Sequence, residues 1–427
     1  MTVYPTYKDS GIEWLGQIPT HWELTRISSV LTEVKDLNTS LRFSHPSQFK
    51  FGDIILKPDV NIEDVSSLSK CIIFRKDDIL INGLNLNYDF VTQRIARANY
   101  TGIITSAYIA VRVRNNLSSK YVTYLFKALD SRKVFNGLGT GIRLTLTYKE
   151  LKKYYILLPP QEEQRQIVAY LDYKSNKINE RICQRERELQ TLSELKQAEI
   201  ATVVTRGLDP NVPMKESGIE WLGKIPAHWN VKRIASVSHE INDSNVTMEY
   251  TQPSQFKFGE IVLKSIIGEG EYDENIKKCT LFKKNDILIN GLNLNYDFVT
   301  QRVAKSNYDG IITPAYIVIR VKDGLSADYA MFLFKSIDNK KIFNGWGTGI
   351  RLTLSYKELK KQCIPIPPKE EQDAIVAYLQ SRITFIDNYI AKLKEEINYL
   401  QEYKQRLISD VVTGKVDVRG VEIPNEE

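Results

Sequence analysis

The sequence ILINGLNLNYDFVTQR at residues 79–94 returns without a change at residues 287–302, an offset of 208 residues. Two copies this far apart in the sequence indicate a duplicated domain, because the repeats of a solenoid are only about 20–50 residues long. Working outward, KDSGIEWLGQIPTHWE from Lys8 returns as KESGIEWLGKIPAHWN from Lys215, an offset of 207 residues. The chain is therefore predicted to contain two copies of one unit.

Other segments repeat as well, and one pair of segments diverges. SQFKFGDIILK from Ser47 returns as SQFKFGEIVLK, and FNGLGTGIRLTLTYKELKK from Phe135 returns as FNGWGTGIRLTLSYKELKK. The copies differ most over residues 58–70 and 265–278, where the second copy gains one residue. This divergent segment is where two otherwise similar domains are expected to differ in detail.

The first part of each copy combines strand-like and helix-like patterns. In the first copy the apolar runs DILIN at 78–82, GIITSAYIAVRV at 102–113 and KYYILLP at 153–159 are bounded by Gly, Asn and Asp, which predicts strands. KYVTYLFKALDS at 120–131 has apolar residues at helical spacing, which predicts a helix. This part is therefore predicted to be α+β.

The second part of each copy is a long charged helix. LLPPQEEQRQIVAYL at 157–171 and PIPPKEEQDAIVAYL at 365–379 place prolines and glutamates at a helix start, where both are favoured. A heptad-like apolar seam then predicts a helix of roughly 30 residues, or about 45 Å. The seam residues are Ile178, Ile182, Leu189 and Leu192 in the first copy and Ile386, Ile390, Leu393, Ile397, Leu400 and Leu407 in the second. Arg185 and Lys196 interrupt the first seam, and Leu195 lies one residue out of phase.

The two seams predict that the helices pair with each other as an antiparallel coiled coil. Packing of each helix on its own globular part is the alternative. The predicted fold class is α+β, with two similar mixed α/β domains, two long paired helices and a pseudo-two-fold internal repeat. The predicted boundaries are residues 1–158 and 209–366 for the globular domains, and residues 159–208 and 367–427 for the helical regions.

Composition limits the class of protein. The chain has 427 residues, 42% of them hydrophobic, which is enough for separate cores. Lys and Arg number 58 against 52 for Asp and Glu, an excess that permits a nucleic-acid partner only if the positive charge is clustered. The four cysteines are far apart, which favours reduced thiols and a cytoplasmic location. The sequence shows no signal peptide and no membrane-spanning stretch, so no membrane partner is expected.

Motifs for catalysis are missing from the sequence. GLGTG at 137–141 and GWGTG at 345–349 lack the preceding strand, the following helix and the lysine of a nucleotide-binding loop. His21 and His228 each precede a tryptophan, which favours structural roles, and no cluster has metal-ligand spacing. Neither a nucleophile elbow nor a zinc-protease helix is present. We expect no catalytic residue, metal site or cofactor in this chain.

Residues suited to reading DNA gather in the repeated segments. Asn and Gln can pair with adenine and Arg with guanine, while Lys and Arg contact phosphates. The candidates in the first copy are Gln48, Lys50, Asn85, Asn87, Tyr88, Gln93, Arg94 and Arg143. The candidates in the second copy are Gln255, Lys257, Asn293, Asn295, Tyr296, Gln301, Arg302 and Arg351. The alternative is that the Asn-rich strings are only turn residues, and a recent duplication would also keep them identical.

The order of these segments resembles the specificity subunits of type I restriction–modification systems. The marks of the resemblance are LLPPQEEQRQIVAYLD at 157–172 and PIPPKEEQDAIVAYLQ at 365–380, the helix ends IATVVTRGLD at 200–209 and ISDVVTGKVDVRG at 408–420, and the two SGIEWLGxIPxHW openings. Together they cover nearly the whole chain.

The resemblance implies a DNA-binding subunit that is not itself an enzyme. Each globular part would be a target-recognition domain for one half of a bipartite double-stranded DNA site, and the paired helices would be the spacer. Two modification subunits, using S-adenosylmethionine to methylate adenine N6, and restriction subunits, using ATP and magnesium, would be its partners. Those cofactors would belong to the partners.

The near-identity of the two domains departs from the family's usual pattern of two dissimilar domains. A pseudo-two-fold arrangement of similar domains predicts two similar half-sites in inverted orientation, close to an interrupted palindrome. The divergent residues 58–70 and 265–278 could still distinguish the half-sites at a base or two. The competing classes are a pure assembly protein and, less favoured for want of motifs, a stand-alone methyltransferase or nuclease.

Overall fold

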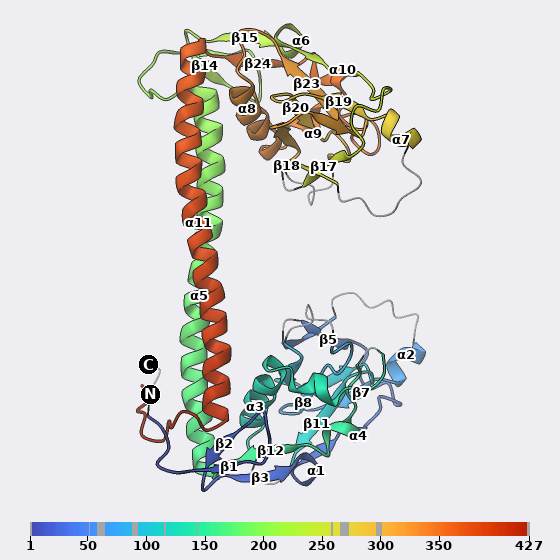
Figure 1. Cartoon of the computed structure of the whole chain (residues 1–427), viewed down its shortest axis with the longest axis vertical. Helices are drawn as coiled ribbons and strands as arrows, with labels where there is room; N and C mark the ends of the chain where they lie inside the picture. Colours follow the sequence, from blue (N-terminus) through green and yellow to red (C-terminus); the bar gives the residue numbers. More distant parts are fainter. Residues whose placement is uncertain are drawn as a thin grey trace. The chain divides into compact units, whose positions relative to one another are not determined.

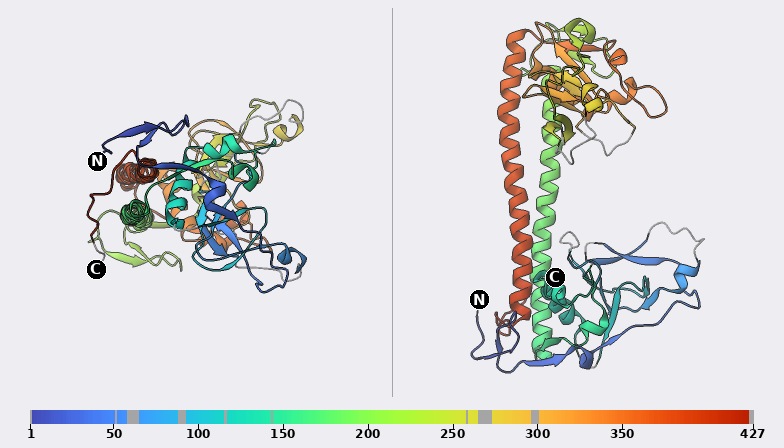
Figure 2. Two further views of the ribbon diagram at one scale, coloured as in Figure 1. Left: turned by 90° about the horizontal axis from the view of Figure 1, so that it is seen from below. Right: turned by 45° about the vertical axis from the view of Figure 1, so that its right-hand side comes forward.

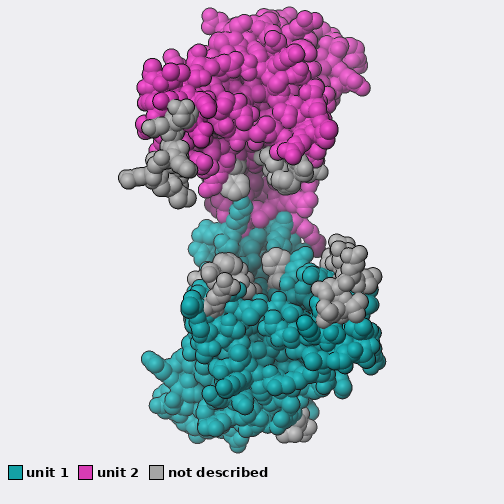
Figure 3. Space-filling view, turned by 90° about the vertical axis from the view of Figure 1, so that its right-hand side faces the viewer, with its two compact units in different colours: residues 1–186, 394–427 teal, residues 187–393 magenta. Residues whose placement is uncertain are grey.

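The chain forms two compact units that each contain one copy of the repeat. The computed structural model describes residues 2–50, 52–57, 65–87, 93–114, 117–142, 144–257, 259–264, 273–295 and 301–424. Unit 1 comprises residues 1–186 and 394–427, and unit 2 comprises residues 187–393 (Figure 3). Each unit holds one globular part and one half of each long helix. The predicted two-domain repeat is confirmed. The long helices do not form separate compact units, because each of the two units includes part of both helices.

The globular part of unit 1 is built from short elements. Its strands are β1 (Tyr7–Asp9), β2 (Gln17–Pro19), β3 (Glu23–Arg26), β4 (Leu31–Glu33), β5 (Pro46–Lys50), β6 (Asp53–Leu56), β7 (Ile72–Phe74), β8 (Ile79–Ile81), β9 (Ile95–Arg97), β10 (Gly102–Ile104), β11 (Ile109–Val113) and β12 (Tyr155–Leu158). Its helices are α1 (Ile27–Val30), α2 (Val65–Ser69), α3 (Ser119–Ser131), the 3₁₀ helix η1 (Val134–Leu138) and α4 (Tyr148–Leu151).

Unit 2 repeats these elements in the same order. Its strands are β13 (Met214–Glu216), β14 (Lys224–Pro226), β15 (Asn230–Arg233), β16 (Ser238–Glu240), β17 (Pro253–Lys257), β18 (Glu260–Leu263), β19 (Thr280–Phe282), β20 (Ile287–Ile289), β21 (Val303–Lys305), β22 (Gly310–Ile312), β23 (Ile317–Val321) and β24 (Cys363–Ile366). Its helices are α6 (Ile234–Val237), α7 (Asp273–Lys277), α8 (Ala327–Asn339), α9 (Ile342–Trp346) and α10 (Tyr356–Leu359).

Two four-stranded sheets form the centre of each globular part. In unit 1 their strand orders are β6-β5-β10-β7 and β4-β11-β8-β9, and in unit 2 the equivalent orders are β18-β17-β22-β19 and β16-β23-β20-β21. Strands β5 and β10 pair in parallel, and β10 pairs with β7 in antiparallel fashion, so the sheet is mixed. The predicted α+β class is confirmed. The run GIITSAYIAVRV forms two strands, β10 and β11, where the apolar pattern alone does not show the turn between them.

Strand β8 is buried on both faces, which explains why its sequence is apolar throughout. Ile79 and Ile81 belong to the core that includes Phe126 of helix α3. Leu80 belongs to a second core with Phe74 of strand β7. Successive side chains of a strand point to opposite faces, so each face of this short strand needs an apolar residue. The strand thereby fixes the position of the loop that follows it.

Two long helices lie side by side: α5 (Gln161–Arg206) and α11 (Lys369–Val412) (Figures 1 and 2). They contain 46 and 44 residues, more than the roughly 30 predicted from the apolar seam. The difference arises because each helix extends beyond the seam into a globular core, with Leu171 of α5 in the core of unit 1 and Leu379 of α11 in that of unit 2. Within the described residues, no helix is long and apolar enough to cross a membrane.

Polar contacts show that the helices are antiparallel within each unit. In unit 1, Asn179 of α5 accepts a hydrogen bond from Lys404 of α11 at 2.7 Å, and Arg185 pairs with Glu396 at 2.9 Å. The residue number therefore rises along α5 while that of the partner falls along α11. The predicted antiparallel pairing of the two helices is confirmed.

The polar interruptions of the first seam are paired across the two helices. Arg185 in unit 1 contacts Glu396, and Lys196 in unit 2 lies 2.7 Å from Asp387. Leu195, which lies out of phase, is 47% exposed. Seam residues such as Ile386, in contrast, are buried. The two seam cations are thus tolerated because the opposite helix supplies a carboxylate to each.

The EEQ motif at the start of α5 connects this helix to the N-terminal segment. The buried Glu163 accepts hydrogen bonds from Trp22 Nε1 at 3.1 Å and from the Tyr4 hydroxyl, and it lies 2.8 Å from His21 Nε2. The predicted structural role of His21 is confirmed. Burial and this hydrogen bond raise the pKa of Tyr4, so its hydroxyl stays a donor to the carboxylate.

The EEQ motif at the start of α11 makes the equivalent contacts in unit 2, with two partner side chains where unit 1 has three. Glu371 accepts a hydrogen bond from Trp229 Nε1 at 2.9 Å and lies 2.7 Å from His228 Nε2. Its side chain is 25% exposed, whereas that of Glu163 is 4% exposed. In unit 1 the C-terminal segment adds further cover, because Asp417 pairs with Thr2 as an isolated bridge.

Candidate nucleic-acid interface

The identical sequence NGLNLN forms a loop after strand β8 that we call the Asn loop, residues 82–87. Three of its carbonyl oxygens converge on the guanidinium group of Arg94. The two terminal nitrogens of Arg94 donate to the carbonyls of Asn82 at 3.2 Å, Leu84 at 2.5 Å and Asn85 at 2.9 Å. Arg94 is only 4% exposed. Its side chain therefore sets the shape of the loop from beneath.

Asp130 of helix α3 completes this arrangement. Its carboxylate accepts a hydrogen bond from the backbone N–H of Arg94 at 3.1 Å and lies 3.9 Å from Nε of the same residue. Burial lowers the pKa of the Arg94 guanidinium and raises the pKa of the Asp130 carboxyl, and the attraction between the two groups opposes both shifts. The loop is thus tied to the helix by a buried charged pair.

Unit 2 repeats this arrangement at its own Asn loop, residues 290–295. Arg302 donates to the carbonyls of Leu292 at 2.6 Å and Asn293 at 2.9 Å, and Asp338 accepts from the Arg302 backbone N–H at 2.8 Å. Arg302 is also 4% exposed. The sequence-based assignment of Arg94 and Arg302 as DNA contacts is therefore corrected: these guanidinium groups are buried and hold protein carbonyls, so they position the loops.

A tight hairpin packs on each Asn loop. In unit 1 it is closed by the pair Thr140–Thr145, and Leu144 has the left-handed backbone conformation that non-glycine residues rarely adopt. The Leu86 N–H donates to the Leu144 carbonyl at 2.9 Å. Gly83 allows the close approach, because a Cβ there would lie 2.4 Å from the Leu146 carbonyl oxygen. The two elements therefore form one module, which the second copy repeats with Thr348–Thr353.

Each hairpin presents an isoleucine to solvent, and the hairpin of unit 2 also presents an arginine. Ile142 and Ile350 are both 100% exposed. Arg351, beside the second of these, is exposed, in agreement with its predicted place on a loop. Arg143, its counterpart in the first copy, lies outside the described residues. The backbone has a positive φ at Leu144 and at Leu352, next to the tip of each hairpin.

Three further candidates of the first copy, Asn85, Asn87 and Gln93, follow strand β8 in the chain. Asn85 is half-buried with a left-handed backbone, and Asn87 is exposed. The exposed Gln93 lies against Gly52, where a Cβ would come within 2.6 Å of the Gln93 Oε1 atom. Tyr88 lies outside the described residues. The segment after β8 is thereby brought next to the hairpin of β5 and β6.

Strand β5 supplies the two other candidates of the first copy. Gln48 is half-buried within the strand, opposite Ile55 of β6, and Lys50 is exposed at the strand end. In the second copy Gln255 and Lys257 occupy the same positions on β17 and have the same exposure. Only the lysine of each pair extends into solvent at the strand end.

The candidates near the second Asn loop follow the same arrangement. Asn293 and Asn295 are exposed, and the exposed Gln301 lies against Gly259. Tyr296 lies outside the described residues. The repeat in sequence is therefore a repeat in local geometry, with each unit carrying one Asn loop, one hairpin and one strand-end lysine.

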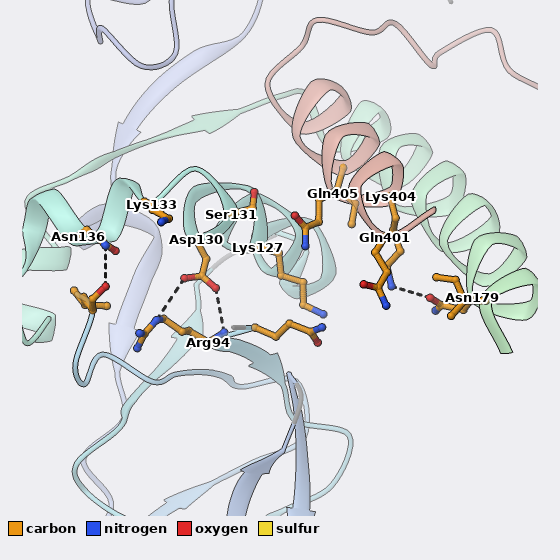
Figure 4. A pocket seen from close by; sticks show the side chains of 14 residues that line it. Arg94, Lys127, Asp130, Ser131, Lys133, Asn136, Asn179, Gln401, Lys404 and Gln405 are labelled. Atoms are coloured by element: carbon orange, nitrogen blue, oxygen red, sulfur yellow. Dashed lines mark hydrogen bonds and ion pairs between the residues drawn. The ribbon is translucent and has the colours of Figure 1, made fainter. Parts of the chain in front are cut away.

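A cavity of about 410 Å³ in unit 1 holds residues that sequence reasoning did not identify (Figure 4). It lies between helix α3 and the paired halves of α5 and α11. Lys127 and Lys404 both point into it, beside Gln93 and the Arg94–Asp130 pair (Figure 4). A lysine on a helix gives no signal of such a site by itself. The available signal was a difference between the copies, in which Asn179 of the first helix corresponds to Asp387 of the second.

Among the described residues, no group of three or more His, Cys, Asp or Glu side chains could hold a metal ion. The four cysteines, two of them buried, are all free thiols. The interface is therefore characterised by amides, lysines, exposed isoleucine tips and buried arginines. These groups suit hydrogen bonding, phosphate contact and apolar contact with base steps.

Known proteins resemble this chain in sequence and in fold. A profile described as the type I restriction modification DNA specificity domain matches residues 31–189 and 226–399. The type I restriction enzyme MjaVIII specificity subunit of Methanocaldococcus jannaschii is 24% identical, over 97% of this chain and 98% of the relative. The putative MjaX specificity subunit of the same organism is 21% identical, over 95% and 96%. A structure from a study of assembly and conformational transition of a type I restriction–modification system has a TM-score of 0.65 at 16% identity, over 93% of this chain and 99% of that chain.

Each unit contains one copy of the duplicated α+β domain, with one exposed loop module and one half of each long helix. The profile matches most of the chain, once in each copy. The chain therefore belongs to the type I restriction modification DNA specificity family, and its class is the specificity subunit, which recognises a DNA target.

Proposed function

We propose that this subunit reads a bipartite, near-palindromic DNA target and directs adenine-N6 methyltransferase and restriction subunits to it. The observation that carries the proposal is the repeated loop module. The segments 79–94 and 287–302 are identical in sequence and in the contacts of their buried arginines. Two surfaces with the same donors and acceptors prefer the same bases, so the two half-sites are similar.

The proposal assigns chemistry to the partners and recognition to this chain. S-adenosylmethionine, ATP and magnesium belong to the modification and restriction subunits, and this chain contributes no catalytic group. Recognition is assigned to this chain because its repeated loop modules carry amide and basic side chains at the surface. A pure assembly protein is the competing class, and it predicts no preference for any DNA sequence.

Mapping of methylated adenines is the experiment that tests this function. The chain is co-expressed with its modification subunit, and methylated positions are read across a genome by single-molecule sequencing. We expect a bipartite motif whose halves are similar and inverted. Two unrelated halves would contradict the palindrome and place base choice in residues 58–70 and 265–278. A stable complex that methylates no defined motif would contradict the recognition role.

Replacement of Arg351 by alanine tests the hairpin of unit 2. We expect DNA binding by the complex to weaken about tenfold, the loss of one contact of roughly 1–3 kcal/mol. The free energy of unfolding should change by less than about 0.5 kcal/mol, because the side chain is exposed. Fluorescence anisotropy with a duplex containing the mapped target measures DNA binding, and urea denaturation measures the free energy of unfolding. Binding equal to that of the unmodified complex would remove Arg351 from the interface.

A further inference from the structure

The cavity of unit 1 is rich in hydrogen-bond donors. The lining side chains that carry hydrogen-bond donors include Lys127, Gln401, Lys404 and Gln405 (Figure 4). The one carboxylate among the lining residues, Asp130, is already engaged by Arg94. Its volume of about 410 Å³ falls within the range of small-ligand pockets, roughly 300–1,000 Å³. Such a lining favours an anion.

Two ammonium groups of the cavity lack a paired carboxylate. The side chain of Lys127 on helix α3 makes no hydrogen bond or ion pair with any residue that the structure describes. Among the described residues, the ammonium group of Lys404 on helix α11 donates only to the neutral Asn179 Oδ1, at 2.7 Å. Burial lowers the pKa of both lysines, repulsion by Lys127 lowers that of Lys404 further, and attraction by Asp53 opposes these shifts. Desolvated cations that repel each other are stabilised by an anion placed between them.

The second copy differs at one residue of this arrangement. Lys335 corresponds to Lys127, and Lys196 corresponds to Lys404, but Asp387 takes the place of Asn179. Both Asp387 oxygens accept from Lys196 Nζ, at 2.7 and 2.8 Å. A carboxylate built into unit 2 thus neutralises the lysine that remains uncompensated in unit 1.

We propose that the unit 1 cavity binds a backbone phosphate of the DNA target through Lys127 and Lys404, and that Asp387 weakens the equivalent contact in unit 2. This inference rests on the proposed DNA-recognition function. A phosphate is favoured because Leu86 of the Asn loop also lines the cavity, so a DNA strand at that loop lies beside the lysines. Two nearly identical recognition domains would then hold their half-sites with unequal strength.

Exchange of the differing residue between the copies tests the inference. Asn179→Asp gives unit 1 the carboxylate of unit 2, and Asp387→Asn gives unit 2 the amide of unit 1. Each phosphate contact contributes about 0.9 to the slope of log K against log salt. We expect Asn179→Asp to reduce that slope by about 1 and to weaken binding about eightfold at 0.1 M salt, and Asp387→Asn to raise the slope by about 1.

The measurement uses the complex with its modification subunit and a duplex carrying the mapped target, titrated at several salt concentrations. Asn176→Asp is the matched control, because Asn176 is an exposed residue of the same helix that does not line the cavity. A slope for Asn179→Asp equal to that of the wild type or of the control would overturn the inference. Stabilisation by inorganic phosphate that needs Asn179, with unchanged slopes, would assign the cavity to a free anion and also overturn it. Loss of target preference by the wild-type complex would instead contradict the proposed function.

Discussion

Replacement of Arg94 by alanine is expected to reduce the free energy of unfolding of unit 1 by about 3–5 kcal/mol and to abolish recognition of its half-site. The guanidinium group is 4% exposed and donates to three carbonyls of the Asn loop. Without it those carbonyls lose their partners, and Asp130 keeps the backbone N–H of residue 94 but loses its neighbouring cation. The same loop supports the hairpin at Leu144 and Leu86, so both elements lose their position.

Urea denaturation followed by circular dichroism measures the stability change, and hydrogen exchange of residues 82–87 locates it. Arg302→Ala is the matched variant, with the same expected loss confined to residues 290–295. Gln93→Ala is the control for the unfolding measurement only, because the Gln93 side chain is exposed and is itself a candidate DNA contact. Arg94→Lys keeps the positive charge but loses the forked set of guanidinium donors. Its free energy of unfolding should lie between those of the wild type and of Arg94→Ala. Full DNA binding by a folded Arg94→Ala complex would show that the loop does not read DNA.

Replacement of Glu163 by alanine is expected to destabilise unit 1 by about 3 kcal/mol, because removal of a buried acceptor leaves two or more donors unsatisfied. Trp22 Nε1 and the Tyr4 hydroxyl both donate to this carboxylate. Loss of the acceptor should release the N-terminal segment from helix α5. Hydrogen exchange of residues 2–22 should then rise sharply, while the Asn loop of unit 1 stays protected.

Glu371→Ala is the comparison that the duplicated chain itself provides. Glu371 is 25% exposed, against 4% for Glu163, so water can replace part of the lost interaction. Glu371 contacts a tryptophan and a histidine, but among the described residues no tyrosine donates to it as Tyr4 donates to Glu163. We expect a loss of about 1 kcal/mol, measured by urea denaturation. Equal losses in the two variants would contradict the view that burial and Tyr4 make the first site the stronger one.

Much of the architecture could be predicted from the sequence because it depends on repetition and periodicity. The identity of residues 79–94 and 287–302 predicts two domains of one fold, and the seam that includes Ile386 and Leu393 predicts paired helices. These features are local patterns, and a local pattern fixes which face of an element is apolar. Helix length was underestimated, since Leu171 and Val204 pack on globular cores that the seam does not reveal.

The roles of individual polar residues were decided by the tertiary structure alone. Arg94 and Arg351 both stand in repeated polar segments, yet the first is buried beneath a loop and the second is exposed on a hairpin. Lys127 and Lys404 share a cavity although they are far apart in the chain. The sequence by itself determined the duplication, the fold class and the family. Whether a charged side chain contacts DNA, holds a loop in place or lines a cavity depends on its exposure and its partners. Long-range packing sets both, and the residue type alone does not reveal them.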